Sequence, residues 1–99
     1  MGKIKMAQHE LKIAPIYYQQ VFLGYKNFEI RKNDRDFNAG DRVFLKEFDV
    51  DSQVYTGRQL IADIGYVCDY EQKPDYVVFS LLRVHTYTQP ELPPLGIYS

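Results

Sequence analysis

The feature that most constrains the fold is an alternating, highly charged stretch at residues 24–48, with the sequence GYKNFEIRKNDRDFNAGDRVFLKEF. Because successive side chains of a β-strand point to opposite faces of a sheet, the spacing predicts a first strand with Phe28 and Ile30 on its packing face. Glu29 and Arg31 share the opposite face. Asn, Asp and Gly dominate the next segment and are typical of a turn, after which a second alternating run begins. The stretch therefore predicts two strands joined by a polar turn, with opposite charges paired on the first.

Three more strands and one short helix are predicted from the remaining sequence. Pro15 suits the first position of a helix and Gly24 the position just beyond its end, so they bracket a helix of about two turns at residues 16–23. Its apolar side is expected to cover one end of a sheet and to pack Tyr17 and Tyr18. Alternating or continuous apolar runs predict strands at residues 9–13, 59–67 and 75–84. The result is a mainly β, α+β fold: a small curved sheet or partly closed β-barrel with a covering helix.

The length and composition are those of one ordinary globular domain, spanning residues 1–99. Of the 99 residues, 45% are hydrophobic and 25% charged, so one core is expected, over residues 9–85. Residues 86–99 contain three of the five prolines and predict an extended tail. The single cysteine, Cys68, excludes an internal disulfide, and no apolar run approaches the roughly 18 residues that span a bilayer. We therefore expect a soluble, cytoplasmic protein that is a monomer or weak dimer.

Aromatic and charged residues are unevenly used. The chain contains nine Tyr and six Phe but no Trp, and tyrosine suits surfaces that are both apolar and hydrogen-bonding. Residues 1–46 carry nine Lys or Arg against five acidic residues, whereas residues 47–99 carry three against eight. Two interpretations stay open: the fold separates a basic face from an acidic one, or it interleaves the two halves and mixes the charges.

Four residues form the frame G-x-K-x-x-E-x-R, namely Gly24, Lys26, Glu29 and Arg31. The frame is followed by Ala-Gly-Asp at residues 39–41, directly before a strand. Together these features resemble the pattern of the ASCH domain, which belongs to the PUA-like superfamily. The resemblance implies a small PUA-like β-barrel with a cleft between the barrel and its covering helix.

Three further segments resemble a narrower ASCH-related family of bacterial and phage proteins that is known only as a domain of unknown function. They are HELK at residues 9–12, EIRKNDR at residues 29–35 and YTGR at residues 55–58. With them the resemblance covers nearly the whole chain, residues 9–85. It implies that the cleft binds RNA or a modified nucleotide, as has been proposed in such families.

A binding site in this cleft would use cationic, paired and aromatic side chains. Lys26, just beyond a helix C-terminus, can donate to a phosphate or carbonyl oxygen. Glu29 and Arg31 can offer an acceptor and a forked donor to the edge of a base, although an ion pair that only stabilises the barrel would use them equally well. Tyr25 can stack on a base. The candidate residues for binding RNA or a nucleotide are Lys12, Tyr25, Lys26, Glu29, Arg31 and Arg35.

Other basic residues have weaker claims to a function. Arg42, Lys46 and Arg58 can contact phosphates along the outer barrel, but a solvated surface position explains each of them as well. His9 can add positive charge to the cleft, whereas a surface histidine without a role is the simpler expectation. His9 and His85 lie far apart in the sequence and no CxxC or HxxxH spacing occurs, so neither a metal nor a cofactor is expected.

Two other functions stand as alternatives to a binding module. Some ASCH proteins are amidohydrolases that deacylate acetylated cytidine with a lysine, a threonine and a glutamate. Lys26 matches that lysine and Glu29 occupies the threonine position, so these two residues are the catalytic candidates if the chain is an enzyme; the family's glutamate has no counterpart that can be assigned. The second alternative is an accessory protein of phage or plasmid type that binds another protein through the proline-rich residues 89–96.

Overall fold

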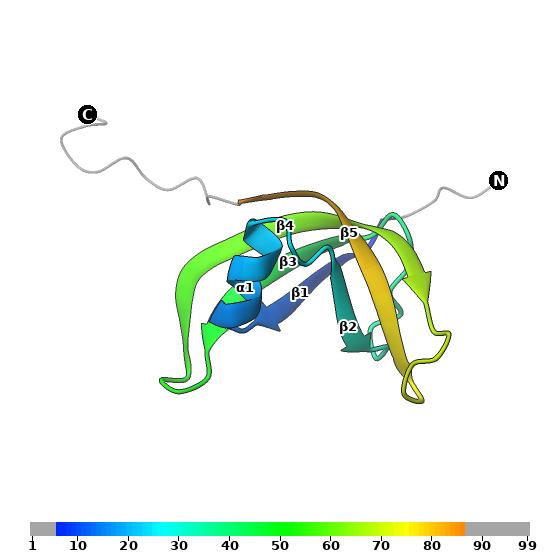
Figure 1. Ribbon diagram of the computed structural model, residues 1–99, viewed down its shortest axis with the longest axis horizontal. Helices are drawn as coiled ribbons and strands as arrows, with labels where there is room; N and C mark the ends of the chain where they lie inside the picture. Colours follow the sequence, from blue (N-terminus) through cyan, green and yellow to red (C-terminus); the bar gives the residue numbers. More distant parts are fainter. Residues whose placement is uncertain (1–5, 87–99) are drawn as a thin grey trace.

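The computed structural model describes residues 6–86 and shows one helix and five strands in them (Figure 1). They are β1 (Gln8–Ile13), α1 (Pro15–Phe22), β2 (Phe28–Lys32), β3 (Arg42–Asp49), β4 (Val54–Cys68) and β5 (Tyr76–Thr86). The predicted mainly β fold with one short helix is confirmed. Residues 1–5 and 87–99 lie outside the described residues, and with them most of the predicted proline-rich tail.

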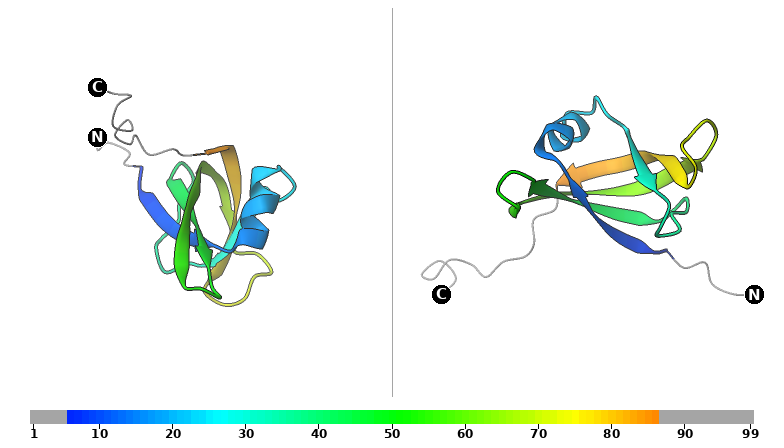
Figure 2. Two further views of the ribbon diagram at one scale, coloured as in Figure 1. Left: turned by 90° about the vertical axis from the view of Figure 1, so that its left-hand side faces the viewer. Right: turned by 90° about the horizontal axis from the view of Figure 1, so that it is seen from below.

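The strands form one curled sheet in the order β1-β3-β4-β5-β2. β1 runs parallel to β3, and all other neighbours are antiparallel. β4 and β5 are long, with 15 and 11 residues, and their pairing shifts register twice. The sheet rolls into a half-barrel whose two edges are β1 and β2 (Figure 1, Figure 2). This curl confirms the partly closed barrel that the sequence predicts.

Alternate strand residues form most of the core. Val43 and Leu45 of β3 are fully buried, as the alternation predicts. Phe37, from the connection between β2 and β3, turns inward and packs its ring 4.9 Å from that of Phe79, measured between centroids. The core cluster contains Leu11, Ile13, Tyr18, Val21, Phe37, Val43, Leu45, Leu60, Ala62, Ile64, Val77, Phe79 and Leu81.

β2 is the strand whose two faces were assigned the wrong way round from the sequence. The alternation itself is present, but Glu29 is 3% exposed whereas Phe28 and Ile30 are 42% and 53% exposed. The physical reason is that Lys26 and Arg31 both bind the Glu29 carboxylate, which compensates its negative charge and allows the inner face to accept it. The apolar side chains of β2 are thereby left on the outer face.

The end of α1 directs the chain into β2. α1 begins at Pro15, as predicted, and beyond its end Gly24 has a φ of +86°, a conformation that favours glycine. The backbone amides of Tyr25 and Lys26 both donate to the Gln20 carbonyl oxygen. The chain therefore folds back over the last helical turn, which holds Tyr25 and Lys26 beside the helix.

The buried side of α1 is narrower than the sequence predicts. Tyr18 and Val21 are buried, but Tyr17 and Phe22 are both about half exposed. Positions three apart share one side of a helix, and α1 has only eight residues, so a single pair reaches the sheet. Tyr17, expected in the core, instead faces the side of α1 on which Lys26 lies.

Candidate functional site

A hollow of about 720 Å³ lies between α1, β2 and the end of β1. We call it the aromatic hollow. It is lined by Lys12, Ile13, Ala14, Tyr17, Gln20, Tyr25, Lys26, Phe28, Glu29, Ile30 and Arg31. Five of the six residues predicted from the sequence to bind RNA or a nucleotide are among them.

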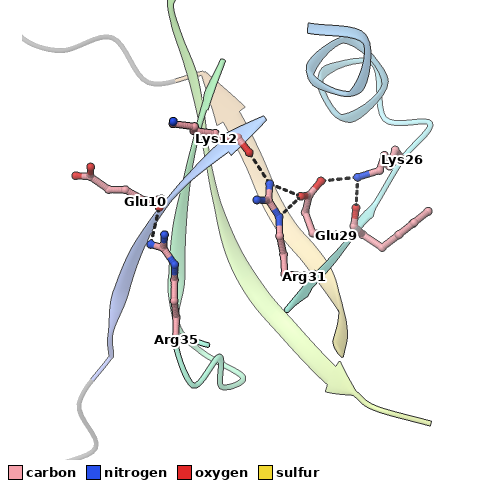
Figure 3. A network of polar contacts seen from close by, with 7 residues as sticks. Glu10, Lys12, Lys26, Glu29, Arg31 and Arg35 are labelled. Atoms are coloured by element: carbon pink, nitrogen blue, oxygen red, sulfur yellow. Dashed lines mark hydrogen bonds and ion pairs between the residues drawn. The ribbon is translucent and has the colours of Figure 1, made fainter. Parts of the chain in front are cut away.

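Glu29 is the centre of a polar cluster in the aromatic hollow (Figure 3). Its Oε2 accepts a hydrogen bond from Lys26 Nζ, and its Oε1 accepts one of 2.9 Å from Arg31 Nε. Lys26 Nζ also donates to the Phe28 carbonyl oxygen, at 2.8 Å. The side chains of Lys26 and Arg31 are 19% and 25% exposed, against 5% for Glu29. The cluster therefore presents partly exposed donors around a buried acceptor.

Aromatic and aliphatic side chains form the other wall of the hollow. Tyr25 is 77% exposed, and Tyr17, Phe28 and Ile30 are all exposed as well. Lys26 Nζ lies 5.4 Å from the ring centroid of Tyr17 and 5.1 Å from that of Phe28, which are cation–π distances. Exposed rings next to convergent polar groups suit a planar ligand that has a polar edge.

Arginine side chains bridge the opening of the half-barrel between β1 and β2, which do not pair with each other in the sheet. Arg31 Nη2 donates to the Lys12 carbonyl oxygen at 2.7 Å, and Arg35 Nη1 donates to the Glu10 carbonyl oxygen at 2.8 Å (Figure 3). Guanidinium groups thus satisfy carbonyl oxygens along β1 at the edge of the sheet. We call this line of contact the seam.

A second hollow, of about 540 Å³, lies on the seam and shares Lys12 and Arg31 with the aromatic hollow. It is lined by Glu10, Leu11, Lys12, Arg31, Arg35, Lys46 and Tyr55, and we call it the cationic hollow. Lys12 Nζ lies 4.2 Å from the ring centroid of Phe48, and Lys46 Nζ lies 3.2 Å from a Glu10 carboxylate oxygen. The structure thus places all six predicted binding residues in the linings of these two hollows, together with Lys46.

Arg58 and Arg42, considered from the sequence as phosphate contacts, are engaged by carboxylates. Arg58 donates two hydrogen bonds of 2.8 Å to Glu47, which is 2% exposed, and its guanidinium lies 4.4 Å from the Tyr18 ring centroid. The hydrogen bonds from Arg58 hold the pKa of Glu47 below its usual value, although burial opposes them. Arg42 pairs with Asp63 at 3.2 Å. Neither arginine lines either hollow of the seam.

His9 is not the surface histidine that the sequence favoured. It is 7% exposed, and its Nε2 lies 2.8 Å from Asp41 Oδ2. The Asp41 carboxylate also accepts the backbone amides of Ala7 and Asn38. Burial alone would raise the pKa of Asp41, but these hydrogen bonds outweigh burial and lower it. The pair ties β1 to the turn before β3, away from both hollows.

Sequence reasoning missed that Phe28 and Ile30 form part of the apolar wall of the aromatic hollow. The signal that could have revealed it is the spacing of Lys26, Glu29 and Arg31. Two cations that flank one carboxylate can neutralise it and allow its burial, so the charged face of β2 becomes the inner face. The adjacent apolar residues are then expected outside.

Two further observations concern metal ions and membranes. Among residues 6–86, no three His, Cys, Asp or Glu side chains gather as a metal ion requires. In the same part of the chain, no helix has the length and apolarity needed to cross a membrane.

The five-stranded curled sheet, the one short helix and the two hollows beside the seam define a small, mainly β protein with a half-barrel fold. The chain matches the family model described as a domain of unknown function, DUF3850, over residues 8–81, and it belongs to that family. It is also 38% identical over 71 residues to a protein of Escherichia phage P2 described as "Uncharacterized 12.9 kDa protein in GpA 3'region". That match covers 71% of this chain and 63% of the relative, less than two thirds of its length.

Proposed function

We propose that this protein is a binding module of the ASCH type, within the PUA-like superfamily, that takes a base of RNA or of a modified nucleotide into the aromatic hollow. The observation that carries the proposal is that one hollow combines exposed aromatic rings with the polar cluster of Lys26, Glu29 and Arg31. The half-barrel with a short covering helix and the G-x-K-x-x-E-x-R frame support the ASCH assignment.

In this proposal the aromatic wall and the polar cluster have separate roles. A base stacks on Tyr25, whose exposed ring is free of the core. Each stacked base contributes about 1–3 kcal/mol in proteins that bind single strands. The base edge then meets Lys26 and Arg31 as donors and Glu29 as acceptor, which gives selectivity among bases. Because these three groups already hold one another, they need little reorganisation when a ligand arrives.

A hydrolase acting on acylated nucleosides is the second function that this hollow allows, with Lys26 and Glu29 as its catalytic residues. The observation that favours it is the direct contact of a lysine with a buried carboxylate in a hollow. Binding is better supported, since Lys26 Nζ donates to both Glu29 and the Phe28 carbonyl oxygen and so has two of its hydrogens engaged. A lysine acting as base or nucleophile must first be released from such contacts.

The experiment that tests the proposal is an amide-shift NMR titration of the labelled protein. The ligands are a short structured RNA, the four common ribonucleosides and acetylated cytidine, each at low and at physiological salt. We expect the shifts to gather at Tyr25, Lys26, Glu29 and Arg31. If acetylated cytidine is consumed during the titration, the hydrolase replaces the binding module, and shifts located elsewhere would remove both.

Tyr25→Ala is the variant that tests the stacking role most directly. Loss of one stacking ring costs about 1–3 kcal/mol, which corresponds to an affinity about 5- to 150-fold weaker. Tyr70→Ala is the matched control, because Tyr70 is 74% exposed and lies in the connection between β4 and β5, outside both hollows. Both rings are largely solvent-exposed, so neither change is expected to unfold the protein. Equal affinities of the two variants would contradict the stacking role.

A further inference from the structure

The two hollows of the seam follow one another along β1. The aromatic hollow is lined from β1 by Lys12 and Ile13, and the cationic hollow by Glu10, Leu11 and Lys12. At about 3.3 Å per strand residue, their centres lie only a few residues apart. A single ligand of nucleotide size therefore reaches from one hollow into the other.

The cationic hollow has the charge of a site for an anion. Four cations line it, Lys12, Arg31, Arg35 and Lys46, against one carboxylate, that of Glu10. The aromatic hollow is lined by three cations, Lys12, Lys26 and Arg31, and by one carboxylate, that of Glu29, which Lys26 and Arg31 both bind. The excess of positive charge is therefore larger in the cationic hollow.

Two ammonium groups in the cationic hollow are available to a ligand. Lys12 Nζ lies over the rings of Phe48 and Tyr55 and forms no ion pair with any carboxylate in residues 6–86. Lys46 Nζ pairs with Glu10, whose side chain is 69% exposed. An ion pair with so exposed a partner contributes little stability, so a phosphate can replace it at small cost.

We propose that the cationic hollow binds the phosphate of the nucleotide whose base occupies the aromatic hollow. The inference rests on the proposed function and adds the ligand class: a phosphorylated nucleotide, free or within an RNA strand, rather than a nucleoside. Lys12 and Lys46 donate charge-assisted hydrogen bonds to the phosphate oxygens, and Arg35 adds its guanidinium at the far side. Arg31 lines both hollows and links the two parts of the site.

The proximity of the aromatic hollow favours a nucleotide over an acidic peptide. A peptide rich in Asp or Glu would use the cations but not the exposed rings next to them. A nucleotide uses both, because its aromatic and anionic parts lie on opposite sides of one sugar.

Titration calorimetry with paired ligands tests this inference. The probes are adenosine, cytidine, uridine, guanosine and acetylated cytidine, each with its 5′-monophosphate, and an eight-nucleotide single-stranded RNA. For any base that binds, we expect the monophosphate to bind at least about tenfold tighter than the nucleoside at low salt, with the difference shrinking as salt rises. Tighter binding of the RNA than of the monophosphate identifies a strand as the source of the phosphate, and the reverse order identifies a free nucleotide.

Lys46→Gln, at a residue that lines the cationic hollow but not the aromatic hollow, is expected to remove most of the advantage of the monophosphate while leaving nucleoside affinity within about twofold. Lys73→Gln is the matched control, because it removes one charge from a residue that lines neither hollow of the seam. Arg35→Gln, at an exposed position, repeats the test if Lys46→Gln shows a changed amide spectrum.

The outcomes separate this inference from the proposed function. If nucleoside and monophosphate bound equally well and the variants had no effect, the proposed base site would be retained and the phosphate site would be overturned. No binding of any nucleoside, nucleotide or RNA would overturn both. A glutamate-rich peptide that displaces the monophosphate at equal charge concentration would show a non-selective anion surface and also overturn the inference.

Discussion

Glu29 and Glu47 are both buried carboxylates that accept hydrogen bonds from an arginine. Their surroundings differ, because Glu47 is enclosed by residues of the fold whereas Glu29 borders a hollow. Glu47 is bound by Arg58 on both oxygens, with Thr56 donating a further hydrogen bond at 2.6 Å, and Arg58 stacks on Tyr18. Glu29 lies instead in a hollow lined by exposed rings. The first cluster connects α1 to β3 and β4; the second faces a ligand-sized space.

At the residue scale, Arg58→Ala tests whether the Glu47 cluster is structural. The change leaves a buried carboxylate without its main partner, and we expect the free energy of unfolding to fall by about 1–3 kcal/mol. Arg83→Ala is the control, since Arg83 is 71% exposed and its partner Asp63 also binds Arg42; a loss below about 1 kcal/mol is expected there. Urea unfolding followed by circular dichroism measures both. If both variants lost the same free energy of unfolding, the burial of Glu47 would not make its ion pair with Arg58 more important for stability than an exposed pair.

At the scale of elements, the bend of β4 depends on a close approach to β5. A Cβ atom placed on Gly65 would lie 2.7 Å from Ser80 Oγ and 2.9 Å from Leu82 Cδ1. The pairing of β4 with β5 shifts register between Ile64 and Val67, a segment that contains Gly65. Gly65 thus lets the two long strands approach where they curve.

Gly65→Ala is therefore expected to destabilise the protein by about 1–3 kcal/mol through overpacking. The backbone of Gly65 does not have a positive φ, so the cost is steric. Adding Leu82→Ala removes one of the two contacts, and the double variant should lose less stability than the sum of the single variants. Thermal unfolding of the four proteins measures this coupling. If the losses of the two single variants simply added in the double variant, the cost of Gly65→Ala would not arise from its contact with Leu82.

At the scale of the whole molecule, carboxylates with lowered pKa values hold distant segments together. Asp41 connects β1 to the turn before β3, Glu47 connects β3 to β4, and Asp63 joins β3 to β4 and β5 through Arg42 and Arg83. Hydrogen bonds from arginine hold the pKa of Glu47 and Asp63 below their usual values; for Asp41, hydrogen bonds from His9 and two amides outweigh the opposing effect of burial. Ionised carboxylates therefore contribute to the stability of the entire half-barrel.

Acid is accordingly expected to destabilise the protein. A carboxyl with a lower pKa in the folded state binds fewer protons there, so its stabilisation is present above the unfolded pKa and is lost as the pH falls through the folded pKa. We expect the urea midpoint to fall steadily below about pH 4. Asp63→Asn should reduce this dependence, since it removes one of the three groups. A midpoint that stays constant from about pH 5 to pH 2.5 would refute the assignment.

How much of this structure can be inferred from the sequence depends on the range of the interactions. Pro15 and Gly24 predict the start and end of α1, because each restricts or permits the backbone conformation at its own position. Alternation predicts β3, because each inward residue contacts its neighbours across the sheet. The inward turn of Phe37 follows in the same way, from one apolar residue in a polar turn. By contrast, the exposure of Tyr17 depends on where α1 meets β2.

The sequence by itself determined the elements, their order and the frame that contains Lys26, Glu29 and Arg31, since backbone propensity and side-chain alternation are local properties. The tertiary structure decided that Glu29 points inward and Phe28 outward, because burial of this carboxylate depends on Lys26 and Arg31 both reaching it. It also decided that Lys12, Arg35 and Lys46 lie on one seam with that cluster. The reason is that β1 and β2, consecutive strands in the sequence, become opposite edges of the sheet, and only its curl brings Arg31 and Arg35 within hydrogen-bond distance of β1.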